Sequence, residues 1–196
     1  GELEVVEVNI RGVTGGSVIV IGEDYGEGAS IIQERSHAFA MKSSIWLLDP
    51  RPSHRRFVPL IEEAFELSET TNAPVMMEFR IRACHVHGSF VCKDNRRPQF
   101  SRDRVLSDPE FDYARICLPP STYLQEKQKM ERRLPAAIEF VRRRRLNELF
   151  PGELEEVGIV LQGGLYNSVI RALGQLGLAD PFGRSRVPLY VLNVTY

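Results

Sequence analysis

The sequence predicts an α/β protein built on a mostly parallel, doubly wound sheet. Between residues 16 and 82, apolar strand-like runs alternate with segments of helical periodicity, in the order strand, helix, strand, helix, strand. In addition, two apolar runs, residues 18–21 and 157–161, each lead into a glycine-rich turn and then a helix-like segment. Strands joined by helices pair in parallel through right-handed crossovers. Ligands of such sheets bind at the carboxyl ends of the strands, so both turns are candidate binding loops.

The first half of this pattern contains a strand, a turn, a helix and a short second strand. Residues 16–21 form an unbroken run rich in β-branched residues, which predicts a parallel strand buried on both faces. Residues 30–42 gather most of their apolar side chains toward one side and predict a helix. Residues 44–48 predict the second strand, which the Asp-Pro-Arg-Pro of residues 49–52 ends.

The second half adds a helix and a third strand. Residues 57–69 predict an amphipathic helix whose apolar stripe comprises Leu60, Ile61, Ala64, Phe65 and Leu67. Residues 74–82 alternate apolar with polar side chains, which indicates a strand with one buried face.

Beyond residue 92 the organisation changes. Residues 93–120 lack periodicity, and an irregular stretch of that length is usually functional or a connection between domains. Helical spacing returns over residues 123–150, with Met130, Leu134, Ile138 and Val141 on one stripe, and Pro135 should kink or divide the helix. We therefore expect an α/β domain over residues 1–92, a connection with basic helices over residues 93–150, and the start of a second α/β unit over residues 151–196.

Composition and charge exclude several classes of protein. The chain has 196 residues, 43% of them hydrophobic and 26% charged, with a net charge of -1, so no global field attracts nucleic acid or an anionic membrane. The four arginines at residues 142–145 would point in different directions around a helix, which favours solvated pairing with acidic residues over phosphate binding. No apolar run approaches the roughly 20 residues that span a bilayer. The first residues lack the features of a signal peptide, and we expect a cytoplasmic protein.

The cysteines and histidines do not predict a metal site. Cys84, Cys92 and Cys117 contain no Cys-x-x-Cys spacing, so neither a zinc site nor an iron–sulfur cluster is expected. In a strand, His85 and His87 would share one face beside Cys84, but no third fixed ligand is evident.

The two glycine turns leave several roles open. The first lacks the dinucleotide-binding and P-loop spacings. Its Glu23 and Asp24 stand before a helix, where they can ligate a cation, accept hydrogen bonds from ligand hydroxyls or cap the helix. After Gly163 and Gly164, the side chains of Tyr166 and Asn167 either contact a ligand or only shape the turn.

The order of residues carries a resemblance to a known family. Residues 12–26 contain Gly-Val-Thr-Gly-Gly and Gly-Glu-Asp-Tyr-Gly, and residues 33–35, 40–42, 47–50, 65–69 and 74–76 extend the match. This series resembles the thiamine-diphosphate pyrimidine-domain region of indolepyruvate:ferredoxin oxidoreductases, within the 2-oxoacid:ferredoxin oxidoreductase family. Residues 158–167 and 187–196 look like the start of the transketolase-C-terminal-like domain that follows it.

The resemblance implies an activity for a longer parent polypeptide. Such enzymes decarboxylate an aryl 2-oxoacid on thiamine diphosphate and Mg, transfer the acyl group to coenzyme A, and pass electrons through iron–sulfur clusters to ferredoxin. The chain begins without methionine and stops directly after a strand-like run, so we expect a fragment. The activating glutamate would precede Gly1, and the metal-anchoring Gly-Asp-Gly segment and the cluster cysteines are absent from the sequence. We therefore expect no catalytic residue, no bound cofactor and no activity in the fragment alone.

Position along the predicted sheet selects the candidate site residues. Thr14, Glu23, Asp24, Tyr25 and Gly26 are expected to form part of the cofactor-site wall, and Arg11 is a candidate partner for a substrate carboxylate. Other domains of the same polypeptide, partner subunits and a second copy are the expected partners. The alternative is a noncatalytic α/β binding or assembly module for a nucleotide or coenzyme A, which the same topology supports.

Overall fold

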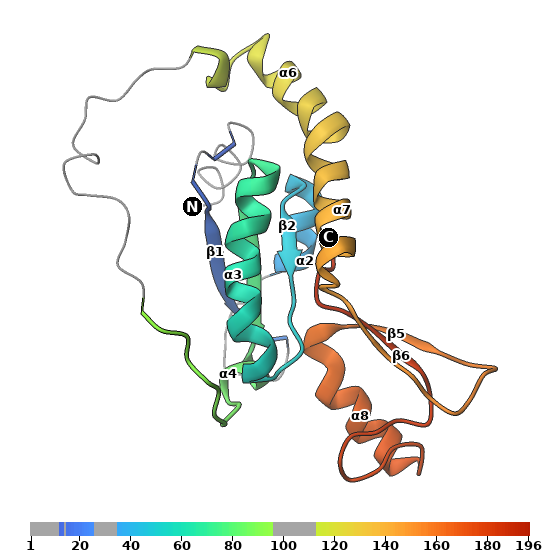
Figure 1. Cartoon of the computed structure of the whole chain (residues 1–196). Helices are drawn as coiled ribbons and strands as arrows, with labels where there is room; N and C mark the ends of the chain where they lie inside the picture. Colours follow the sequence, from blue (N-terminus) through green and yellow to red (C-terminus); the bar gives the residue numbers. More distant parts are fainter. Residues whose placement is uncertain (1–11, 14, 26–34, 96–112) are drawn as a thin grey trace.

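The first structural unit is a parallel sheet with helices on both faces. The computed structural model describes residues 12–13, 15–25, 35–95 and 113–196 (Figure 1). Strands β1 (Val18–Glu23), β2 (Trp46–Leu48) and β3 (Val75–Arg80) are parallel and lie in the order β1-β3-β2. This order places β3 between two strands that precede it in the sequence, as in a doubly wound sheet, and confirms the predicted fold class.

Two apolar cores enclose this sheet. Helices α3 (His54–Thr71) and α7 (Leu134–Arg144) cover one face, where Leu60, Leu67 and Phe140 pack against Val75 and Met77. On the other face, Ala40 and the half-buried Phe39 of helix α2 (Ser36–Ser43) pack with Ile45, Leu47 and Met76. Residues 30–34 of the expected first helix lie outside the described residues.

Burial differs from the sequence prediction in two strands. Strand β3 is buried on both faces from Val75 to Glu78, although its alternating pattern predicted one buried face. Strand β1 was predicted to be buried on both faces, yet Val20 is 64% exposed. The reason is the strand order, because β3 occupies the centre of the sheet and β1 lies at its edge.

After β3 the chain turns instead of continuing as a strand. Residues Ile81–Cys84 form the short helix α4, so the predicted strand ends two residues early. His85 and His87 therefore do not occupy alternate positions of a strand, and the premise that placed them on one face is wrong.

One long helical segment leads from the connection to the second unit. It comprises helix α6 (Ser121–Gln128), a π-helical turn (Lys129–Arg133) and α7, preceded by a 3-10 turn (Tyr113–Arg115). Pro135 lies in the first turn of α7, directly after the π-helical turn. A proline has no N–H to donate, and the change from π-helical to α-helical geometry at this point accommodates the missing hydrogen bond.

The predicted apolar stripe of this segment is correct for Leu134 and Val141, which pack against the first core, and wrong for Met130 and Ile138. Met130 and Ile138 are 53% and 43% exposed, whereas Arg133, Ala137 and Phe140 are buried. The π-helical turn changes the helical period upstream of α7, so the repeat that put Met130 in line with Leu134 does not follow one face. The helix also ends at Arg144 rather than near residue 150, because Arg145 adopts the left-handed conformation with φ 50°.

The second unit is a smaller mixed sheet. Strands β4 (Glu148–Phe150), β5 (Ile159–Gln162) and β6 (Leu189–Leu192) lie in the order β4-β6-β5, with β5 parallel and β4 antiparallel to β6. The glycine turn Gly163–Leu165 and helix α8 (Tyr166–Gln175) cover one face, where Leu161, Leu173, Leu189 and Val191 are buried. Strand β4 precedes residue 151, where the second unit was expected to begin.

The last four residues join the two sheets. After β6 the chain runs antiparallel to β2, and the Asp49 N–H donates to the Asn193 carbonyl at 2.9 Å. Two further backbone bonds link Leu47 with Thr195 and Tyr196, each 2.9 Å long. The free edge of β2 is therefore paired with the end of the chain.

Among the described residues, no helix is both long and apolar enough to cross a membrane.

Candidate functional site

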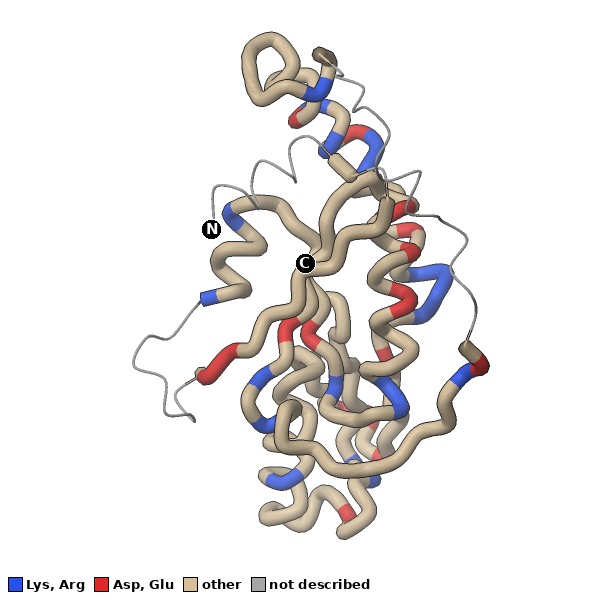
Figure 2. The backbone as a smooth tube through the Cα atoms, turned by 90° about the vertical axis from the view of Figure 1, so that its left-hand side faces the viewer, with Lys and Arg blue, Asp and Glu red and all other residues tan. Residues whose placement is uncertain are grey.

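A cluster of charged side chains lies at the carboxyl ends of the strands of the first sheet. Glu23 ends β1, Glu78 and Arg80 stand at the end of β3, and Asp49 directly follows β2. Figure 2 shows acidic segments of neighbouring strands side by side near the centre of the molecule, with basic segments beyond them. Their placement follows from the parallel pairing, which brings these strand ends to one edge.

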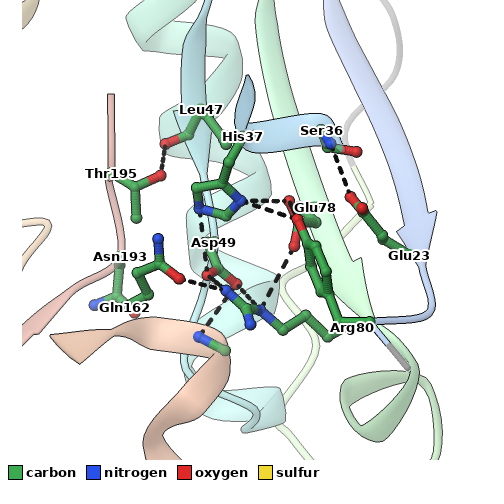
Figure 3. A network of polar contacts seen from close by, with 12 residues as sticks. Glu23, Ser36, His37, Leu47, Asp49, Glu78, Arg80, Gln162, Asn193 and Thr195 are labelled. Atoms are coloured by element: carbon green, nitrogen blue, oxygen red, sulfur yellow. Dashed lines mark hydrogen bonds and ion pairs between the residues drawn. The ribbon is translucent and has the colours of Figure 1, made fainter. Parts of the chain in front are cut away.

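Asp49 and Arg80 form the central ion pair of this cluster. The Arg80 guanidinium donates to Asp49 Oδ2 at 2.6 Å and to Oδ1 at 3.3 Å (Figure 3). Burial raises the pKa of Asp49 above its ordinary value, and the hydrogen bond from Arg80 offsets part of that effect. Burial by itself lowers the pKa of Arg80, but Asp49 and Glu78 outweigh it and hold that pKa above its ordinary value. The ionised pair is stabilised by mutual contact.

His37 joins this pair to a second buried carboxylate. Its Nδ1 lies 3.1 Å from Glu78 Oε2, and its Nε2 lies 3.8 Å from Asp49 Oδ2. The Tyr25 hydroxyl lies 3.1 Å from His37 Nδ1 and donates to Glu78 Oε2 at 3.3 Å. Burial, followed by the charge of Glu78, raises the pKa of Tyr25, so the hydroxyl keeps its proton.

Glu23 occupies the start of α2. Its Oε2 accepts a hydrogen bond of 3.1 Å from the backbone N–H of Ser36, the first residue of the helix. A carboxylate at this position is favoured by the free N–H groups of the helix terminus. The buried Oε1 of Glu23 has no hydrogen-bond partner among the described residues, and the same holds for Glu78 Oε1. Glu78 Oε1 lies 3.5 Å from Arg80 Nε in an ion pair, so Glu23 Oε1 is the acceptor of these two that is open to a further donor.

The second glycine turn docks on the carboxyl edge of the first sheet. The Gly164 N–H donates to Asp49 Oδ1 at 3.1 Å, and Arg80 donates to Gln162 Oε1 at 2.7 Å. A methyl group on Gly163 would collide with the Asp49 carbonyl and lie 2.7 Å from Arg51 N. Because no side chain fits there, the glycines permit the close approach of the two units.

A second polar contact completes this junction. Arg51 donates to both carboxylate oxygens of Glu148, at 3.1 and 3.0 Å, and its guanidinium lies over the rings of Phe150 and Tyr166. The Asn193 amide accepts from Arg51 N at 2.8 Å and donates to Glu148 at 3.0 Å. Burial by itself raises the pKa of Glu148. The hydrogen bonds from Arg51 and Asn193 lower it by more, so the pKa lies below its ordinary value.

The structure describes three of the predicted site residues. Glu23, Asp24 and Tyr25 lie at the carboxyl end of β1, with Glu23 buried and the other two half-buried. Arg11, Thr14 and Gly26 lie outside the described residues. Sequence reasoning missed six members of the cluster, although the strand-end rule used for Glu23 also applies to two of them, Asp49 and Arg80. The missed residues are His37, Asp49, Glu78, Arg80, Gln162 and Asn193.

The cluster offers hydrogen-bond acceptors to a ligand. In the described ranges, no group of three or more His, Cys, Asp or Glu residues could hold a metal ion. Cys84 and Cys92 are exposed free thiols. Arg80 is engaged by Asp49, Gln162 and the ring of Tyr25, 4.8 Å from its guanidinium carbon. What the edge offers a ligand is therefore buried carboxylate oxygen.

Comparison with known proteins finds two similar subunits of one enzyme. No family model and no solved structure matches the chain. The chain is 29% identical over 190 residues to the indolepyruvate oxidoreductase subunit IorA of Methanothermobacter thermautotrophicus. This alignment covers 94% of the chain and 28% of that subunit. It is 28% identical over 197 residues to the IorA subunit of Methanothermobacter marburgensis, covering 97% of this chain and 29% of that subunit. The chain thus spans less than a third of the curated relatives it matches. The resemblance carried by the sequence is confirmed, because nearly the whole chain is similar to IorA subunits of indolepyruvate oxidoreductase.

Proposed function

We propose that the chain is part of a thiamine-diphosphate-dependent oxidoreductase that acts on indolepyruvate or a related aryl 2-oxoacid. The observation that carries the proposal is the similarity to two IorA subunits, in alignments that cover 94% and 97% of the chain. The parent reaction releases the carboxyl group as CO₂, transfers the remaining acyl group to coenzyme A, and delivers two electrons to ferredoxin. Thiamine diphosphate supplies the electron sink in this chemistry.

Within that enzyme, the carboxyl edge of the first sheet forms one wall of the cofactor site. We assign Glu23, Asp24 and Tyr25 to this wall, together with Gly26, which follows Tyr25 in the sequence, and Thr14, which precedes β1. The unpartnered Oε1 of Glu23 supports the assignment, because it can accept a hydrogen bond from an amino group of a bound ligand. Glu23 is 3% exposed, so a ligand donor here would replace a missing interaction of a buried group.

The remaining parts of the machinery belong to other segments. The described residues offer no group able to hold Mg, and the three cysteines of the sequence lack the spacing of an iron–sulfur site. We therefore assign Mg, the clusters and the activating glutamate to the rest of the parent protein, and Arg11 to the substrate carboxylate. The 196-residue chain alone is inactive in this proposal. Its partners are the missing domains or subunits and a second copy, while ferredoxin and coenzyme A serve the complete enzyme.

The test is an anaerobic assay of the full-length parent, loaded with thiamine diphosphate, Mg and its clusters. We expect reduction of a viologen dye that requires both indolepyruvate and coenzyme A, and no reduction by the 196-residue chain. Glu23→Gln keeps an acceptor but removes the charge, and it should weaken thiamine diphosphate binding more than Glu153→Gln, an exposed control. A loaded full-length protein that turns over no 2-oxoacid would overturn the proposal.

A further inference from the structure

One face of the second sheet carries an apolar row with no described element over it. Leu149, Tyr190 and Val160 are register partners on β4, β6 and β5, so their side chains lie on the same face. They are 70%, 41% and 66% exposed. The neighbouring positions Leu189 and Val191 point to the opposite face, where α8 buries both completely. Figure 1 shows α8 on that covered side of β5 and β6.

The apolar row continues into a groove beside α7. The groove has a volume of about 690 Å³, and Leu149 and Tyr190 line it together with Ile138 of α7 and Tyr196. Arg142 and Arg145, both exposed, stand on its α7 side. Neither arginine forms an ion pair with a described residue, in contrast to Arg144, which pairs with Glu63 and Glu66. The surface is therefore apolar along its floor and positively charged on one flank.

Such a surface matches an amphipathic helix with acidic residues on one flank. Parallel strand pairs such as β5 and β6 are normally covered by helices on both faces, and here a described helix covers one. A contiguous exposed apolar patch rimmed by charge is typical of an interaction surface. The two unpaired arginines favour carboxylates on the approaching element.

We propose that this face binds an amphipathic helix of the parent subunit, one that lies outside the 196 residues and carries Asp or Glu opposite Arg142 and Arg145. The inference rests on one part of the proposed function, namely that the chain belongs to a longer parent protein. The length of the relatives supports this occupant, because more than two thirds of each IorA subunit lies outside the matched segment. A helix of the same subunit is present at high effective concentration, so a modest apolar row is sufficient to hold it.

The test compares the same substitutions in the 196-residue chain and in the full-length parent. Val160→Glu puts a charge on the exposed row, and Leu176→Glu, 72% exposed just beyond α8, is the matched control on the opposite side of the unit. We expect Val160→Glu to leave the melting temperature of the short chain nearly unchanged and to lower that of the parent by several degrees. Leu176→Glu should change neither, and Arg142→Glu should act in the parent alone, less strongly at high salt.

Three outcomes of these measurements would contradict the proposal. Equal effects of Val160→Glu in both proteins, or no effect in either, would show that nothing outside the chain covers the row. If light scattering finds the short chain as a dimer that Val160→Glu dissociates, a second copy is the occupant. The dye assay is independent of these readouts. A parent without oxidoreductase activity that still shows the Val160→Glu difference would retain the interface and lose the proposed function.

Discussion

Replacing Gly163 by alanine should push the two units of the molecule apart. The added methyl group would meet the Asp49 carbonyl and lie 2.7 Å from Arg51 N and 2.8 Å from Asn193 Oδ1. Two of these three atoms are backbone, and Asp49 N is itself hydrogen-bonded to the Asn193 carbonyl, so the neighbours have little freedom to move. The clash is relieved only if the glycine turn moves away from the first sheet.

The expected cost combines overpacking with lost hydrogen bonds. Inserting a methyl group into a closely packed contact costs about 1–3 kcal/mol. Moving the turn also weakens the 2.7 Å bond from Arg80 to Gln162 and the 3.1 Å bond from Gly164 N to Asp49, and a bond to a charged group is worth about 1.5–3 kcal/mol. Because part of this loss is recovered by water, we expect Gly163→Ala to lower the free energy of unfolding by about 3–5 kcal/mol.

Urea unfolding measures this effect and has an internal reporter. Trp46 is the single tryptophan and is buried in the core of the first unit, so its fluorescence follows that unit while circular dichroism follows the whole chain. Gly158→Ala is the control, because a methyl group there meets one atom, the Pro188 carbonyl, at an ordinary 3.7 Å. We expect Gly163→Ala to separate the two transitions and Gly158→Ala to leave them coincident. Equal stability of the two variants, within about 0.5 kcal/mol, would refute the close-approach argument.

Three further substitutions test the polar contacts. Arg80→Met leaves the buried Asp49 carboxylate without its partner and should cost about 3–5 kcal/mol in urea unfolding, and adding Asp49→Asn should recover part of that loss. Because folding lowers the pKa of Glu148 from its ordinary value of 4.5, the ionised carboxylate stabilises the folded protein at pH values above 4.5. This stabilisation is lost as the pH falls through the lower pKa of the folded state, so Glu148→Gln should flatten the fall in stability below pH 4.5. An unchanged acid profile would contradict this. Ser68→Ala removes a buried hydroxyl that serves two backbone groups and should cost about 1–3 kcal/mol by thermal or urea unfolding, whereas Ser168→Ala, at an exposed helix position, should be neutral.

The order and type of the elements in the first unit were predictable, because alternation of strand-like and helical periodicity is a local property. The position of a strand within its sheet is not local. β3 reads as a half-buried strand, but pairing with both β1 and β2 buries its polar Glu78 completely. In the helix before the second unit, Met130 was misplaced because the π-helical turn ahead of Pro135 changes the helical period on which that part of the predicted stripe depended.

The candidate site was predictable only at its first strand. Glu23 was found because it ends an apolar run before a glycine turn. Its neighbours come from distant parts of the chain, and the contact between Gly164 and Asp49 joins residues 115 positions apart. The carboxyl-end rule applies equally to Asp49, but the Pro-rich residues that follow it looked like a simple turn. No sequence pattern indicated that Gln162 and Asn193 would reach the same edge.

This arrangement changes the interpretation of the second glycine turn. It was a candidate binding loop, yet its N–H and its preceding glutamine are used to hold Asp49 and Arg80. Arg80 in turn lies over the ring of Tyr25, whose hydroxyl contacts His37 and Glu78. The position of Tyr25, a proposed wall residue of the cofactor site, thus depends through Arg80 on how the second unit docks. A movement of that unit would therefore change the position of Tyr25 at the carboxyl end of β1. The change would pass through side chains in direct contact and would not require any change in the strand itself.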